Sequence, residues 1–163
     1  MQITILCVGK IKEAFFRDAI TEYSKRLSRY CKLNIVEVAD EQTPDNASEA
    51  MEDQIRAKEA DRILSKIPDN TGGSVRVITL EINGKKYTSE KLSKRIDDLG
   101  INGISHIVFI IGGSLGLHKK VTDRADENLS FSDMTFPHQL MRVILLEQIY
   151  RCYRISHNEP YHK

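Results

Sequence analysis

The stretch SFSDMTFPHQLMRVILLEQIYR, residues 130–151, is the part of the sequence around which the rest of the chain is organised. Its first half alternates small polar residues with Phe131, Met134 and Phe136, which indicates a short loop. Pro137 then suits the first turn of a helix, because its φ is fixed and it has no N–H group to leave unpaired. Apolar residues then occupy nearly every side of the helix, which predicts a helix buried on most sides. On pattern alone, this is the central core helix of an α/β domain.

The rest of the chain alternates short apolar runs with longer amphipathic segments. The runs predict strands at residues 3–8, 32–39, 75–82, 104–111 and 129–132. The amphipathic segments predict helices at residues 13–29, 49–67, 88–99 and 119–127. An Asn83–Gly84 turn is expected after the third strand, and Gly100 is expected to end the third helix. Because alternating strands and helices form crossover units, we expect one α/β domain over residues 1–163, with helices flanking a mostly parallel sheet.

Length and composition narrow the class of protein. The chain has 163 residues, of which 40% are hydrophobic and 29% charged, as is ordinary for one globular domain with a core. No apolar run approaches the length that crosses a bilayer, and the chain opens in a strand-like pattern without an export signal. We therefore expect a cytoplasmic protein that does not contact a membrane.

Cysteine and histidine usage argues against a disulfide scaffold and a metal site. Cys7, Cys31 and Cys152 are odd in number, far apart and without a C-x-x-C pair. The five histidines show no ligand spacing either. We expect Cys7 and Cys152, which sit among apolar neighbours, to be buried and unreactive, and we expect no metal.

The net charge limits how the chain can bind nucleic acid. Twenty-four basic and 23 acidic residues give a net charge of +1, whereas nucleic-acid-binding proteins are usually strongly basic. Any RNA contact must come from a local patch, or from a patch that two subunits build together.

Three strand ends stand out as places for a ligand, since ligands of open parallel sheets bind beyond the carboxyl ends of the strands. They are Leu80, Gly112 and the loop at residues 131–136. The turn GGSLG at residues 112–116 is neither a Walker A loop nor a dinucleotide fingerprint, and by itself it fits a structural turn as well as a ligand loop. Ser114 and Ser132 are not in a nucleophile elbow, and Glu81 is the one carboxylate at these strand ends, so hydrolytic chemistry has little support.

The last five residues, EPYHK, combine an aromatic ring, an imidazole and a cation directly after the long helix. Such an end can fray into solvent, or it can close over a pocket and contact a base. The residues alone leave both possibilities open.

Three motifs together, IIGGSLGLH, LSFSDMTFPHQLMRVILLEQIYR and the terminal PYHK, resemble one family over essentially the whole chain. This is the bacterial ribosomal RNA large-subunit methyltransferase H family, which belongs to the SPOUT class. The resemblance implies methylation of N3 of a pseudouridine in 23S rRNA of assembled ribosomes. It further implies a homodimer and a C-terminal trefoil knot, in which S-adenosylmethionine binds. The cofactor contacts that it implies are Leu80, Gly112, Phe131, Ser132, Asp133, Met134, Thr135 and Phe136.

The resemblance also assigns roles at the end of the chain. Tyr161, His162 and Lys163 match the family's tail, and Arg151 matches an arginine near the same pocket. We hypothesise that Tyr161 and His162 form a lid that positions or deprotonates the base, with His162 as the better proton acceptor. Arg151 would hold a phosphate or favour the uridine anion. Asp133 departs from the family's usual residues and places a negative charge beside a sulfonium.

A function of another class is compatible with the same fold. A ribosome-binding or assembly module without catalytic activity would share the motifs of the scaffold. Binding of S-adenosylmethionine separates the two, because a catalyst must bind it and an assembly module need not.

Overall fold

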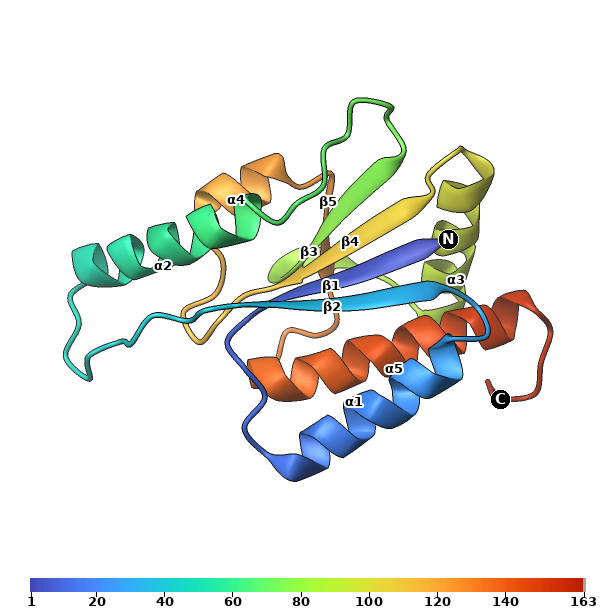
Figure 1. The fold of residues 1–163 in the computed structure, drawn as a ribbon, viewed down its shortest axis with the longest axis horizontal. Helices are drawn as coiled ribbons and strands as arrows, with labels where there is room; N and C mark the ends of the chain where they lie inside the picture. The colour runs from blue at the N-terminus through green and yellow to red at the C-terminus, as the bar shows by residue number, and fades with distance from the viewer. Residues whose placement is uncertain (163) are drawn as a thin grey trace.

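Five parallel strands form the single sheet of this computed structural model, which describes residues 1–162. The strand order is β2-β1-β4-β3-β5, and every neighbouring pair is parallel, as predicted (Figure 1). β1 and β4 lie in the middle, and the side chains of Ile107 and Phe109 are fully buried, as expected for a strand covered on both faces. The strands are β1 (Gln2–Val8), β2 (Lys32–Val38), β3 (Val75–Lys86), β4 (His106–Ile111) and β5 (Glu127–Ser130).

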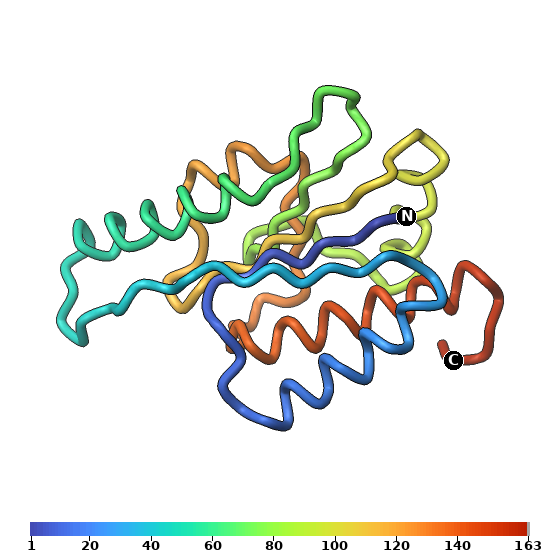
Figure 2. Tube along the Cα trace, in the orientation of Figure 1, coloured from blue at the N-terminus to red at the C-terminus, as the bar shows by residue number. Residues whose placement is uncertain are grey.

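Helices cover both faces of the sheet, which gives three layers (Figure 2). α1, α3 and α5 bury their apolar sides in one core cluster with the sheet, and α2 and α4 do so on the opposite face. Right-handed crossovers between parallel strands place helices on both sides in this way. The helices are α1 (Ala14–Leu27), α2 (Glu49–Leu64), α3 (Ser89–Ile101), α4 (Lys119–Arg124) and α5 (His138–Ser156).

The long helix α5 lies against the middle of the sheet. Leu145, Leu146 and Ile149 are fully buried against the strands. Val143 and Ile144, on other sides of the helix, are only half-buried within the chain. α5 therefore carries more apolar side chains than a single chain fully buries.

β3 is longer than predicted and meets β5 twice. The expected turn at Asn83–Gly84 lies inside the strand, where the register shifts between Leu80 and Lys85. Leu129 of β5 pairs with Leu80 and again with Lys85. A Cβ atom on Gly84 would come within 2.6 Å of the Leu129 carbonyl carbon, so only glycine fits this crossing. The trefoil knot stays a prediction.

Several helix ends differ from the predictions. α2 ends at Leu64 instead of residue 67, and Ser65 caps it. Thr88 caps α3 as expected, but the expected stop at Gly100 is wrong, because the helix continues to Ile101 and Asn102 caps it. The fourth helix ends at Arg124 instead of residue 127. It stops there because Asp126 already pairs with β3, its N–H donating to the Val77 carbonyl over 2.9 Å.

Candidate functional site

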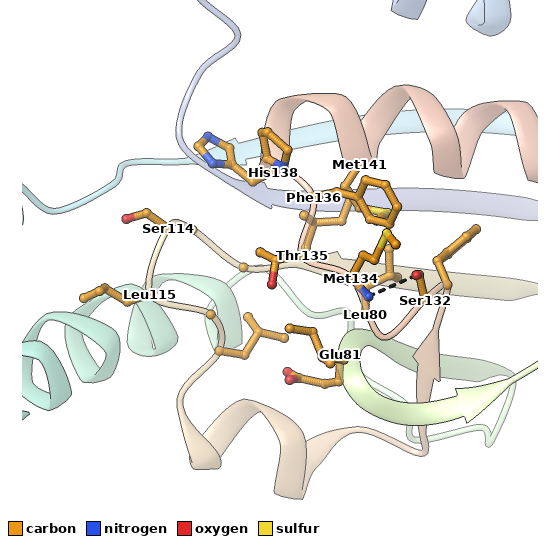
Figure 3. Close-up of a pocket in the computed structure, with 18 of the residues that line it drawn as sticks. Leu80, Glu81, Ser114, Leu115, Ser132, Met134, Thr135, Phe136, His138 and Met141 are labelled. Atoms are coloured by element: carbon orange, nitrogen blue, oxygen red, sulfur yellow. Dashed lines mark hydrogen bonds between the residues drawn. The ribbon is translucent and has the colours of Figure 1, made fainter.

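A cavity of about 860 Å³ lies beyond the carboxyl end of β4 and beside the part of β3 that follows its last pair with β4, Thr79–Ile110 (Figure 3). Three segments far apart in the sequence line it: residues 80–83 inside β3, the turn after β4 and the loop between β5 and α5. The first turn of α5 completes the wall. Seven of the eight residues expected to contact a cofactor line this cavity, namely Leu80, Gly112, Phe131, Ser132, Met134, Thr135 and Phe136.

The turn after β4 brings backbone to the cavity wall. Gly116 has a φ of +77°, and its N–H donates to the Gly113 carbonyl over 3.2 Å, which closes a tight turn. A Cβ atom on Gly112 would lie 2.8 Å from the carbonyl carbon of Gly116. A side chain at residue 112 would therefore force the turn open, and glycine keeps the peptide groups at the cavity surface.

The loop at residues 131–136 is shaped by short-range hydrogen bonds. The Ser132 hydroxyl accepts from the Met134 N–H over 3.0 Å, which is the dashed line of Figure 3. Such a serine turn fixes the backbone without a regular element. Asp133 differs from its neighbours, because its side chain is 82% exposed, forms an ion pair with Lys86 and does not line the cavity.

Among residues 1–162, Glu81 is the only carboxylate that lines the cavity. Its Oε1 atom is buried and has no hydrogen-bond partner within the described residues. Burial raises the pKa of the Glu81 carboxyl above its ordinary value. Because buried polar atoms are nearly always paired, an orphaned carboxylate oxygen in a cavity indicates a place for a hydrogen-bond donor of a ligand. The sequence showed Glu81 at a strand end, but not that the oxygen would be buried and unpaired.

The first turns of α5 add two residues that the sequence pattern did not single out. His138 lines the cavity, and burial lowers its pKa, with nearby Arg142 adding to the effect. Arg142 is buried and donates to Glu37 Oε1 over 2.7 Å and to the Val8 and Gly9 carbonyls over 2.8 and 2.6 Å. In the sequence, the one feature that points to Arg142 is its position as a single arginine within an apolar helical run.

The tail is held against the second half of α5. The Tyr161 hydroxyl donates to Glu147 Oε1 over 3.1 Å, and the Arg151 guanidinium lies 4.7 Å from the centre of the Tyr161 ring. His162 Nδ1 accepts from Arg151 over 3.3 Å, and its Nε2 donates to Glu90 over 2.7 Å. Burial raises the pKa of the Tyr161 hydroxyl, so this group stays a donor.

The structure thus brings together Arg151, Tyr161 and His162, but away from the cavity of the same chain. None of the three lines that cavity. A rise of 1.5 Å per residue places Arg151 about 20 Å along the helix from His138. Lys163 lies outside the described residues.

Within residues 1–162, no group of three or more His, Cys, Asp or Glu side chains is placed to hold a metal ion. Over the same residues, no helix has the length and apolar character to span a membrane. Cys7 and Cys152 are buried, as predicted, and Cys31 is buried as well. Burial raises the pKa of each thiol, to about 12 for Cys7 and Cys152 and about 11 for Cys31.

Comparisons with known proteins agree with this architecture. A family model described as "Predicted SPOUT methyltransferase" matches residues 1–162. The ribosomal RNA large subunit methyltransferases H of Bifidobacterium adolescentis and Clostridium novyi are 63% and 61% identical to this chain, and each match covers both chains completely. A solved structure of a probable methylase family protein from Haemophilus influenzae shares the fold, with a TM-score of 0.55 and 11% identity over 99% of this chain and 70% of that chain. The chain therefore belongs to the ribosomal RNA large subunit methyltransferase H family of SPOUT methyltransferases.

Proposed function

We propose that this protein methylates N3 of a pseudouridine in the large-subunit ribosomal RNA, with S-adenosylmethionine as donor and assembled cytoplasmic ribosomes as substrate. The names of the full-length relatives support the ribosomal RNA as substrate. The observation that carries the proposal is the convergence of Leu80, Gly112 and the loop at residues 131–136 on one cavity. Its volume of about 860 Å³ suits a small-molecule cofactor.

The residues present fit this cofactor. Gly112 leaves the space that a Cβ atom would fill, so that peptide groups can approach the ligand. The orphaned Glu81 oxygen can accept from a hydroxyl or amino group. The backbone at Leu80 and at residues 131–136 would hold the cofactor from the other sides, Asp133 through its backbone because its carboxylate points to Lys86. When bound, the cofactor supplies a methyl group on a positively charged sulfur.

The tail residues act on the nucleotide. N3 of pseudouridine carries a proton that must leave before or during attack on the methyl group. His162 is the proton acceptor, because a neutral imidazole has a ring nitrogen with a free lone pair that can take up the proton. Tyr161 stays protonated and orients the base as a donor, and Arg151 stabilises the negative charge that develops on the base.

A homodimer brings the tail and the cavity together. Within one chain, Arg151 lies about 20 Å along α5 from the cavity wall at His138. α5 also exposes apolar side chains, including Val143 and Ile144, that a second copy would cover. We therefore place Tyr161 and His162 of each subunit over the cavity of its partner.

Two measurements test the proposed function. Mass mapping of 23S rRNA from cells without this protein should show one pseudouridine that lacks a methyl group, and the purified protein with S-adenosylmethionine should restore it. Calorimetry should detect binding of S-adenosylmethionine to the protein alone. Binding to ribosomes with neither methylation nor cofactor binding would instead favour an assembly module.

A further inference from the structure

A second hollow, of about 740 Å³, lies beside the cofactor cavity on the surface formed by β3, α3 and β5. Six cationic side chains line it, against the two carboxylates of Asp98 and Glu127. The chain as a whole has a net charge of only +1, so positive charge is concentrated here. The cationic residues are Arg76, Lys85, Lys86, Lys91, Lys94 and Arg95.

The nearby carboxylates neutralise only part of this charge. Arg76 and Arg95 share one carboxylate, since their Nε atoms lie 3.0 and 3.1 Å from Glu127 Oε1. Burial opposes ionisation of Glu127, but the hydrogen bonds from the two arginines outweigh it and lower the pKa of this carboxyl. Arg76 Nη1 also lies 4.0 Å from Asp126 Oδ1, so two carboxylates balance the charges of the two arginines.

Two lysines add further positive charge. Lys85 and Lys91 form no ion pair within residues 1–162. The ammonium group of Lys85 lies 4.9 Å from the centre of the Tyr87 ring, which fixes it at the hollow without removing its charge. Lys94 and Lys86 do have partners, Asp98 and Asp133. The hollow therefore keeps an excess of about two positive charges, those of Lys85 and Lys91, next to an aromatic ring, which suits an RNA strand.

The hollow is continuous with the candidate active site. Asn83 lines the cofactor cavity and Lys85 lines the hollow, and two residues of chain span at most about 7 Å. Lys86 also bonds to Asp133 in the loop that walls the cavity. A strand whose target base enters the cavity can therefore lay its neighbouring phosphates in the hollow.

We propose that this basic hollow binds the phosphodiester backbone of ribosomal RNA next to the methylated nucleotide. The inference rests on the proposed function and adds to it the surface that holds the substrate. Lys85 and Lys91, the two lysines without an acidic partner among the described residues, contact phosphates. They carry no base specificity and set the register of the RNA against the cavity.

The test replaces the two lysines without an acidic partner. The double variant Lys85→Ala/Lys91→Ala should raise KM for unmethylated large ribosomal subunits roughly tenfold with kcat unchanged, because a contact kept through the transition state is uniform binding. The slope of log affinity against log salt for protein-free 23S rRNA should fall by about 1.4, at about 0.7 for each lost contact to a single strand. Lys85→Arg/Lys91→Arg should restore both values, and calorimetry should show unchanged S-adenosylmethionine binding.

The matched control is Lys32→Ala/Lys66→Ala, which removes two exposed lysines that line neither cavity. If the control matches the test variant in KM and salt slope, the hollow is not the RNA site. An effect on whole subunits without one on protein-free rRNA would assign the hollow to a ribosomal protein and also overturn the inference. Failure of the unmodified protein to methylate rRNA would instead overturn the proposed function.

Discussion

Arg142 on α5 donates a hydrogen bond of 2.7 Å to Glu37 on β2, although the Arg142 side chain is only 1% exposed. Its other terminal nitrogen donates to the Val8 and Gly9 carbonyls at the end of β1. One guanidinium thus ties the start of α5 to the ends of two strands. Because the cavity loop at residues 131–136 leads directly into α5, this contact also fixes one wall of the site.

Replacement of Arg142 should destabilise the fold. Arg142→Met keeps much of the volume but leaves two buried carbonyls and Glu37 without their donor, and Glu37 remains 33% exposed. We expect the free energy of unfolding to fall by about 3 kcal/mol, at the low end for a broken buried pair because water reaches Glu37. Urea denaturation measures it. Arg26→Met, in the exposed pair with Glu22, should lower the free energy of unfolding far less than Arg142→Met, and equal losses would contradict the role of Arg142.

Gly84 should tolerate no side chain. In Gly84→Ala the new Cβ would meet the backbone of Leu129 at 2.6 Å and of Asn128 at 2.8 Å, and neither backbone can move without disturbing β5. We expect a loss of about 1–3 kcal/mol in the free energy of unfolding. Gly72→Ala is the matched control, since nothing lies within 4 Å of its Cβ position and its φ is not positive. A Gly84 variant as stable as this control would show that the crossing is looser than the structure has it.

The predicted elements match the fold because each rests on a local pattern. Apolar runs and helical periodicity gave all five strands, all five helices and the parallel class. The errors lie at element ends whose positions are determined by long-range contacts. β3 continues past Asn83 because it meets β5 a second time, and the helix before β5 stops at Arg124 because Asp126 pairs with Val77. No local pattern contains these partners.

The cavity was predictable for a different reason. Carboxyl ends of parallel strands meet at one edge, so Leu80, Gly112 and the loop before Pro137 had to come together. The buried state of Glu81 depends on side chains from all three segments, and the sequence does not show it. The position of Tyr161 depends on Glu147 and Arg151 holding the tail on α5, which the motif alone could not place.

Glu81→Gln should strengthen the fold and weaken cofactor binding. A carboxyl whose pKa is raised in the folded state favours folding when protonated and opposes it when charged. The variant should therefore match the parent protein below about pH 4, the usual range of a glutamate, and become more stable than the parent as the pH rises through the raised pKa. Thermal unfolding across pH measures this difference.

The affinity of the Glu81→Gln variant for the cofactor should fall, whereas its stability should rise. At a pH above the raised pKa of Glu81, Glu81→Gln exchanges a charged acceptor for a neutral one, and a hydrogen bond to a charged group contributes about 1.5–3 kcal/mol, so affinity for S-adenosylmethionine should fall at least about tenfold. Calorimetry measures it, with Glu49→Gln, at an exposed residue outside the cavity, as the control. Unchanged affinity in both variants would remove Glu81 from the cofactor site.

Deletion of Tyr161–Lys163 should abolish methylation and leave a folded dimer that binds S-adenosylmethionine. Tyr161 contacts Glu147 in the second half of α5, His162 contacts Glu90 on α3, and neither residue belongs to the core clusters. Methyl incorporation, calorimetry and light scattering report the three properties. Full activity after the deletion would end the lid role of Tyr161 and His162.

Mixed dimers decide which cavity the tail serves. One subunit lacks Tyr161–Lys163 and keeps its cavity; the other keeps the tail and carries Gly112→Ala, whose Cβ would lie 2.8 Å from the Gly116 backbone and disturb the cavity wall. If each tail covers the partner's cavity, one complete site remains in every mixed dimer, and activity should return to about half of the parent value. If each tail serves its own cavity, no subunit has both parts, and the mixture should be as inactive as either variant alone. Gly112→Ala homodimers must first prove folded and unable to bind S-adenosylmethionine, so that any recovered activity comes from the cavity of the truncated subunit.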